Sequence, residues 1–143
     1  MAVTSNISIH DFGGTWRIDR TIHDAKSGSV GRFTGVAEFV ADGDGMIYRE
    51  DGQLVLGNGP AMKATRAYHW HQDGGQIVVH FEDGRDFHRF TPNAQSDRAE
   101  HFCDPDTYRV KYDFADWPEW RCEWRVHGPR KDYVMVSHYR REP

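Results

Sequence analysis

Three extended runs near the end of the chain constrain the fold more than any other feature of the sequence. They are residues 107–114, 119–127 and 132–140. In the first two runs apolar and polar residues alternate; in the second, Trp120, Cys122 and Trp124 share one face and charged residues fill the other. A repeat of two residues over this length is typical of half-buried antiparallel strands. The end of the chain is therefore expected to form part of an antiparallel sheet.

Turn-forming residues recur at short intervals along the rest of the chain. Glycine stands beside Asp or Asn at residues 42–45, 51–52, 57–60, 73–75 and 83–84. This pairing supplies the positive φ that tight hairpins require. Extended segments lie between the turns, at residues 14–23, 32–41, 46–50, 53–56, 62–71, 76–82, 85–90 and 98–103. Before them, Ser8–Phe12 predicts one short helical turn, with Ser8 as its cap and Asp11 three residues on.

About ten short strands joined by hairpins are compatible with a sandwich or with a barrel. Almost every connection is short, which suits an up-and-down meander, and closure removes the exposed edges of an aromatic-rich sheet. We therefore expect an all-β fold, a single up-and-down antiparallel β-barrel over residues 1–143 with a short N-terminal helical turn plugging one end. The length suffices for one domain with a substantial core, and no linker or internal repeat interrupts it.

Charge and hydropathy narrow the classes of partner. The net charge is −4 and the two signs are mixed along the chain, so nucleic acid is not an expected partner. No stretch is apolar enough to span a membrane, and residues 1–9 lack the basic start and apolar run of a signal peptide. The expected location is the cytoplasm, where Cys103 and Cys122 would remain free, buried thiols. The sequence leaves open whether the protein forms a homodimer.

Residues 13–16, Gly-Gly-Thr-Trp, open the first expected strand and resemble the Gly-x-Trp motif of the lipocalin and fatty-acid-binding superfamily, the calycins. Proteins of that superfamily are barrels, and their Trp commonly packs near the closed end against an Arg from the last strand. The resemblance implies the same arrangement for Trp16. Arg140 is the best match for the partner, with Arg141 or Arg125 as alternatives.

Four longer segments are similar to the signature of a small family of uncharacterised single-domain proteins. They are residues 33–39 (FTGVAEF), 83–88 (DGRDFH), 101–108 (HFCDPDTY) and 124–133 (WRVHGPRKDY). This resemblance covers most of the chain and implies a small soluble protein of the same fold class. It implies no particular activity and supplies no catalytic residue.

Two arginines share faces with residues that should be buried. Arg20 lies on the apolar face of the first strand, and Arg66 shares a face with Tyr68 and Trp70. A buried guanidinium has to be paired, because desolvating it alone costs several kcal/mol. In the fatty-acid-binding relatives, interior Arg and Tyr residues hold a ligand carboxylate. The first hypothesis is therefore non-catalytic binding of a small acidic or amphiphilic molecule in the barrel cavity.

The residues expected to bind this molecule are Arg20, Arg66, Tyr108, Tyr112, Tyr133 and Trp124. The tyrosines would donate hydroxyl hydrogen bonds. The alternative for each arginine is a structural role, either in an ion pair with Glu50 or over an indole face by a cation–π contact.

Two histidines support a second hypothesis, a cofactor-free barrel enzyme such as an isomerase, cyclase or hydrolase. His88 lies between Phe87 and Phe90 in a strand-like run, and His101 precedes Phe102. With a neighbouring Tyr, either imidazole could act as an acid or base near neutral pH. The alternative is a histidine satisfied within an interior hydrogen-bond network. A third hypothesis has the aromatic residues fill the barrel completely, which leaves a structural protein without a ligand.

Metal and cofactor sites have weaker support in the sequence. His69 and His71 point the same way on a strand and could hold one edge of a zinc or iron site if the next hairpin brings His80 alongside. His138 is the candidate for a single haem ligand. Tyr68 and Trp70 should face the interior, which leaves His69 and His71 toward solvent, and the residues around His138 do not resemble those of haem-binding barrels, so we expect no metal and no cofactor.

Overall fold

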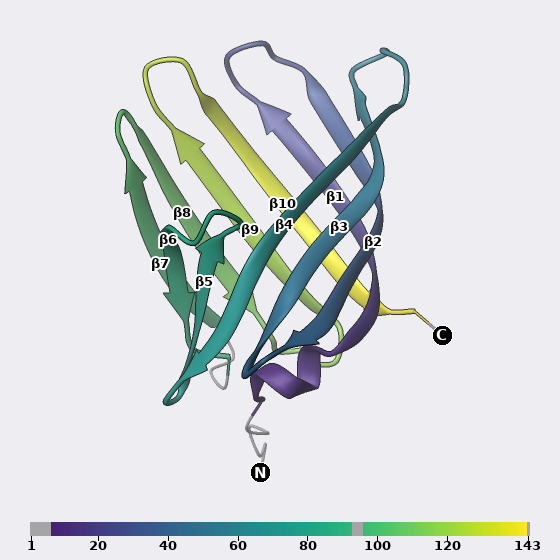
Figure 1. Ribbon diagram of the computed structural model, residues 1–143. Coiled ribbons are helices and arrows are strands. Elements are labelled where there is room, and N and C mark those ends of the chain that lie inside the picture. Colours follow the sequence, from purple (N-terminus) through teal and green to yellow (C-terminus); the bar gives the residue numbers. More distant parts are fainter. Residues whose placement is uncertain (1–6, 93–95, 143) are drawn as a thin grey trace.

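The computed structural model describes residues 7–92 and 96–142, and these residues form ten strands and one short helix (Figure 1). The 3-10 helix η1 spans Ile9–Phe12. The strands are β1 (Gly14–Asp24), β2 (Val30–Asp42), β3 (Gly45–Leu56), β4 (Met62–Asp73), β5 (Gln76–Phe81), β6 (Asp86–Phe90), β7 (Ser96–Cys103), β8 (Asp106–Asp113), β9 (Trp120–His127) and β10 (Asp132–Arg141). The described part of the chain contains no helix long and apolar enough to cross a membrane.

The strands form one antiparallel sheet in the order β6-β5-β4-β3-β2-β1-β10-β9-β8-β7. The first strand also pairs with the last, with Trp16 opposite Arg141 and Asp24 opposite Tyr133. The sheet therefore curls into an up-and-down barrel (Figure 1). The predicted all-β antiparallel barrel is confirmed. The helical turn before the first strand is confirmed too, with a capping box between Ser8 and Asp11.

The barrel is not fully closed, because one pair of neighbouring strands is not joined by backbone hydrogen bonds. Within the described residues no backbone ladder connects β6 to β7, so these strands are the two edges of the sheet. The register between β5 and β6 also shifts: Val79 pairs with His88, but His80 pairs with Asp86. The extra residue of this bulge lets both Phe87 and His88 be buried.

The dipeptide Asp51-Gly52 does not form the turn that the sequence predicts. Strand β3 runs straight through it, and Gly52 pairs with Gly35 of β2. A Cβ atom at Gly35 would lie 2.3 Å from the carbonyl oxygen of Asp51, and one at Gly52 would lie 2.3 Å from that of Thr34. These glycines therefore allow a close approach of two backbones inside the sheet, which is the other common reason for glycine in a strand.

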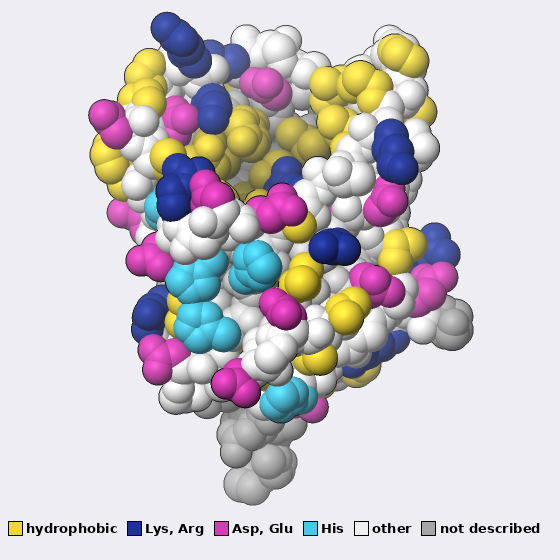
Figure 2. Space-filling model, in the orientation of Figure 1, with side chains coloured by type: hydrophobic (Ala, Val, Ile, Leu, Met, Phe, Trp, Pro, Cys, Tyr) yellow, Lys and Arg dark blue, Asp and Glu magenta, His cyan; other side chains and the backbone are white. Residues whose placement is uncertain are grey.

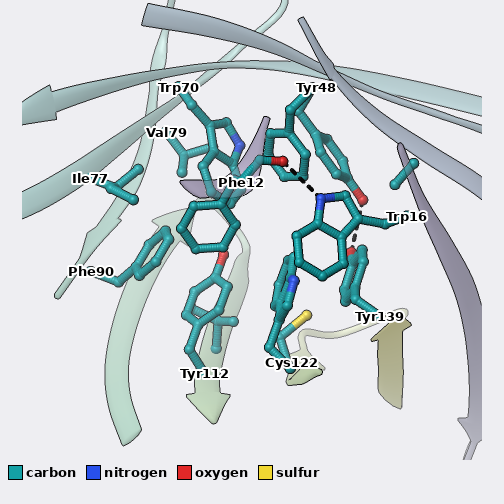
Figure 3. Packing of buried hydrophobic residues seen from close by; sticks show 14 of the residues in the cluster. Phe12, Trp16, Tyr48, Trp70, Ile77, Val79, Phe90, Tyr112, Cys122 and Tyr139 are labelled. Carbon is teal, nitrogen blue, oxygen red and sulfur yellow. Dashed lines mark hydrogen bonds between the residues drawn. The ribbon is translucent and has the colours of Figure 1, made fainter. Parts of the chain in front are cut away.

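Helix η1 closes one end of the barrel with an aromatic cluster (Figure 3). The Phe12 ring is fully buried, with its centroid 5.4 Å from that of Trp70, 5.0 Å from Trp117 and 5.4 Å from Trp120. The backbone carbonyl of Phe12 accepts a 2.8 Å hydrogen bond from Nε1 of Trp16. The half of the barrel next to η1 is therefore filled by side chains.

The arginine that packs on Trp16 is Arg141, so the expectation of Arg140 is wrong. The Arg141 guanidinium lies 4.0 Å from the centre of the Trp16 ring and donates hydrogen bonds to the carbonyl oxygens of Asp11 and Gly13. Register decides between the two arginines, because Arg141 pairs with Trp16 whereas Arg140 is exposed and pairs with Arg17.

Both cysteines are free, as expected. Cys122 is buried, and burial raises the pKa of its thiol to about 11. Cys103 is exposed at the last position of β7, so the prediction that both thiols are buried is wrong for this residue.

Candidate ligand-binding site

The end of the barrel opposite η1 is open. The β1–β2, β3–β4, β7–β8 and β9–β10 hairpins lie there (Figure 1), and a hollow opens between them (Figure 2). We call this hollow the mouth. Hydrophobic side chains line it, and a basic side chain is visible inside it (Figure 2). The partly buried apolar residues that pack on the core include Ile22, Leu54, Ala64, Tyr68, Phe81, Ala99, Tyr108 and Tyr133.

A buried ion pair lies across the middle of the barrel. Arg20 of β1 and Glu50 of β3 are each 4% exposed. The two nitrogens Nη1 and Nη2 of Arg20 donate to the two carboxylate oxygens of Glu50 at 2.9 and 2.6 Å, and its Nε donates to Oγ of Ser137 at 2.7 Å. Such a bidentate pair with satisfied donors is the arrangement in which two charges tolerate burial. Arg20 thus takes the structural role that the sequence left open.

Two tyrosines complete this polar cluster. The hydroxyl of Tyr48 donates to Glu50, and it also forms a 2.8 Å hydrogen bond with the hydroxyl of Tyr139. Burial by itself would raise the pKa of the Glu50 carboxyl, but the charge and hydrogen bonds of Arg20 outweigh it, so that this pKa lies below its ordinary value. Glu50 is therefore ionised at neutral pH and neutralises one guanidinium.

Arg66 is the second guanidinium near this carboxylate. Strand pairing places it opposite Glu50, but its Nε lies 3.7 Å from Glu50 Oε1, a distance too long for a hydrogen bond. Its side chain is 39% exposed, whereas that of Glu50 is 3% exposed. Because Glu50 already binds Arg20 with both oxygens, Arg66 keeps donors available to solvent.

The enclosed part of the interior is small. A cavity of about 30 Å³ is lined by Arg20, Tyr48, Glu50, Arg66, Tyr68, Trp70, Val79, Phe87, His88, Tyr112, Trp120, Cys122, Trp124 and Tyr139. This volume holds about one or two waters, whereas sites for small molecules usually measure about 300–1,000 Å³. A ligand of ordinary size therefore does not fit inside this cavity, and the hollows of about 490 and 430 Å³ lie elsewhere, along β7–β9 and along β5–β7.

The structure brings four of the six expected ligand-binding residues to this cavity. They are Arg20, Arg66, Tyr112 and Trp124. The remaining two, Tyr108 and Tyr133, are half-buried. The hydroxyl of Tyr108 accepts a 3.3 Å hydrogen bond from Nζ of Lys131, and the same nitrogen lies 3.0 Å from Asp106.

Of the two candidates for acid–base catalysis, His88 is buried and His101 is only partly buried. His88 is 9% exposed, and its Nε2 lies 2.9 Å from the hydroxyl of Tyr112. Its Nδ1 has no hydrogen-bond partner within the described residues. Burial, together with the charge of His101, lowers the pKa of His88 to about 3. Burial also raises the pKa of Tyr112 well above its ordinary value, so this pair is neutral near pH 7.

The low pKa of His88 predicts a pH dependence of folding stability. In the unfolded chain this imidazole has its ordinary pKa of 6.5, and in the folded protein about 3. Between these two pH values the unfolded state therefore binds more protons than the folded state. The contribution of His88 to the free energy of unfolding is fully present above pH 6.5 and is lost as the pH falls. We expect the free energy of unfolding of the parent protein to fall by about 2 kcal/mol between pH 7 and pH 5 because of His88. This part of the pH dependence should be absent from His88→Gln, as measured by urea unfolding.

The matched control for this prediction is His138→Gln, because His138 is exposed on the outer face of β10. This variant should follow the pH dependence of the parent protein. Equal slopes for the parent and the His88 variant would show that His88 is protonated without penalty in the folded state.

The three histidines of the metal hypothesis, His69, His71 and His80, lie on β4 and β5. His69 pairs directly with His80 across β4 and β5, as the metal hypothesis required, and the rings of His71 and His80 stack with centroids 5.0 Å apart. His80 Nδ1 lies 3.1 Å from an oxygen of Asp86. Even so, residues 7–92 and 96–142 contain no group of three or more His, Cys, Asp or Glu side chains placed to hold a metal ion.

Sequence reasoning missed most of the polar cluster. Tyr48 and Glu50 are two residues apart on β3, and Ser137 and Tyr139 are two residues apart on β10. Each pair thus shares the inward face, and this spacing was a readable signal. What the sequence could not show is that β1 lies between these strands and places Arg20 against both.

The sequence profile of the DUF6314 family, described as a family of unknown function, matches residues 12–141. The chain belongs to the DUF6314 family. The match spans the barrel from Phe12 to Arg141, and therefore includes Arg20, Glu50 and Arg66. Comparison of this DUF6314 chain with curated proteins finds no match.

Two solved structures have a similar fold. One is described as the S-type phycobiliprotein lyase CPES from Guillardia theta: the TM-score is 0.63 and the identity 12%, over 94% of this chain and 90% of that one. The other is a protein of unknown function from the DUF3598 family of Nostoc punctiforme, with a TM-score of 0.59 and 10% identity. The match to it covers 93% of this chain but only 48% of that one. At these identities the likeness concerns the fold alone.

Proposed function

We propose that this DUF6314 protein binds a small, partly apolar anion in the mouth of the barrel, with the acidic group of the ligand on Arg66. The observation that carries the proposal is the unequal sharing of Glu50 between two guanidinium groups. Arg20 takes both carboxylate oxygens, and Arg66 is left 3.7 Å away and partly exposed. An anion with an apolar body suits a cationic group that stands among apolar walls.

The charges of these three residues support an anionic ligand. The charges of Arg20 and Glu50 cancel, so the three residues together carry one net positive charge, that of Arg66. A guanidinium with free donors forms strong, often bidentate, hydrogen bonds with a carboxylate or sulfonate. The likeness to a phycobiliprotein lyase concerns the fold and does not indicate a ligand for this chain. The proposal therefore rests on Arg66 and the apolar walls.

The test compares two fluorescent probes that share one aromatic body, anilinonaphthalene sulfonate and its uncharged analogue phenylnaphthylamine. The parent protein should bind the sulfonate more tightly. Arg66→Gln should weaken sulfonate binding by roughly tenfold or more, the loss of about one charge-assisted hydrogen bond. Binding of the uncharged probe should change by less than about twofold. Titrations by fluorescence at constant ionic strength give both constants.

The matched control is Arg125→Gln, which removes the same charge from an exposed position on the outer face of β9. It should leave sulfonate binding unchanged, which separates local recognition from net charge. Unchanged affinity in the Arg66 variant would contradict the proposal, and so would an equal loss in both variants.

The geometry gives less support to an enzyme. A general base works best with a pKa near the working pH, and the pKa of His88 is about 3. No acidic group orients its free Nδ1 within the described residues, although such a group is part of most His-based catalytic arrangements.

A further inference from the structure

The walls of the mouth differ in chemistry from one side of the barrel to the other. Ile22 of β1, Leu54 of β3 and Ala64 of β4 are partly buried aliphatic residues on one side. Continuing around the barrel, the partly buried residues become aromatic, with Tyr68 on β4 and Phe81 on β5. We call the first three residues the aliphatic wall and the aromatic residues of β4, β5 and β6 the aromatic wall; Tyr108 of β8 and Tyr133 of β10 add two further rings to the partly buried set.

The aromatic wall contains a column of nearly parallel rings. The ring of Phe81 stacks on that of Phe87 with a centroid distance of 4.4 Å and an interplanar angle of 21°. Phe87 stacks on Trp124 at 5.0 Å and 11°. Phe87 and Trp124 are buried, whereas Phe81 at the end of the column is only partly buried. The column thus comes from β5, β6 and β9. The guanidinium of Arg85, an exposed side chain, lies over its outer ring, 5.4 Å from the centre of Phe81, so a ligand ring would stack there in place of Arg85.

Arg66 lies next to this wall. It is two residues from Tyr68 on the same face of β4, and the Tyr68 ring lies 5.6 Å from that of Phe87 and 6.2 Å from that of Phe81. A ligand whose acidic group binds Arg66 would therefore have its body beside aromatic rings. Offset stacking of one more ring adds attraction beyond the area that it buries.

From this arrangement we infer that the ligand is a flat, conjugated anion, such as an aromatic carboxylate, and not a flexible fatty acid. The inference rests on the proposed function and names its ligand class. A rigid ring system meets the column with a whole face and loses little freedom on binding, whereas an alkyl chain must be ordered bond by bond. Both kinds of ligand would place the same anionic group on Arg66. The difference in affinity between them should therefore come from the rest of the molecule.

The test uses two carboxylates with the same number of carbon atoms, naphthoate and undecanoate, titrated by calorimetry into the folded protein. We expect naphthoate to bind about tenfold more tightly than undecanoate, which corresponds to a stacking contribution at the upper end of its usual range. In NMR spectra of the complex, the side-chain protons of Phe81 and Tyr68 should show ring-current shifts with naphthoate only.

Two variants locate the preference. Phe81→Leu keeps an apolar side chain at the outer end of the column and should weaken naphthoate binding about threefold or more, with less than about twofold change for undecanoate. Leu54→Val on the aliphatic wall is the control and should leave the preference intact. Undecanoate binding as tightly as naphthoate would overturn the inference while leaving anion binding at Arg66 in place. No binding of either acid would overturn the proposed function as well.

Discussion

Replacing Glu50 by Gln is expected to lower the free energy of unfolding by about 3–5 kcal/mol, the usual effect of leaving one member of a buried ion pair without its partner. The side chain of Arg20 is 5% exposed and directs three nitrogens at Glu50 and Ser137. The neutral amide would accept some of these hydrogen bonds but could not balance the charge. Urea unfolding monitored by tryptophan fluorescence measures the loss.

Two further variants show whether charge is the cause. Glu38→Gln makes the same change at an exposed position of β2 and should alter stability by less than about 0.5 kcal/mol. In Arg20→Met/Glu50→Gln no buried charge is left unpaired at this position, so the double variant should be more stable than Glu50→Gln alone. A double variant as unstable as the sum of the two single variants would contradict this explanation.

The second large effect is expected at the closed end of the barrel. Phe12→Ala should reduce the free energy of unfolding by about 3–5 kcal/mol, because truncation of a fully buried aromatic ring leaves a cavity. The Phe12 ring contacts Phe39, Trp70 and Trp120 at centroid distances of 5.6, 5.4 and 5.4 Å. The hydrogen bond from Trp16 goes to the Phe12 backbone and is retained, so the loss reports packing. Urea unfolding again gives the value.

Phe102→Ala is the matched control, because Phe102 is 63% exposed. It should change stability by less than about 0.5 kcal/mol. Since the mouth lies at the opposite end from η1, the folded Phe12 variant should bind the sulfonate probe as the parent protein does. A stability loss no larger than that of the control would show that the cluster repacks around the missing ring.

The fold could be predicted from the sequence because two local signals agree along most of the chain. Apolar residues alternate with polar ones on the strands, and glycine beside Asp or Asn marks most hairpins. Prediction failed where glycine had a second use. Gly52 permits close backbone approach to Gly35 inside the sheet, and no local pattern distinguishes that use from a turn.

The site was predicted only in part, because its properties arise from contacts between strands distant in sequence. Arg20 and Arg66 were recognisable as charges on apolar faces, and Glu50 as a partner for either. Only the register shows that Glu50 binds Arg20 with both oxygens and leaves Arg66 partly free. The choice of Arg141 over Arg140 at the closed end was likewise decided by pairing between β1 and β10.

The missing ladder between β6 and β7 has a mechanical consequence for the barrel. Elsewhere around the wall, neighbouring strands are held at the fixed spacing of a β-ladder. At this one junction the described strands are connected through side chains, among them Phe87 of β6 and His101 of β7, whose ring centroids lie 5.3 Å apart. A change in the diameter of the barrel at this junction would therefore break no ladder of backbone hydrogen bonds between the described parts of β6 and β7.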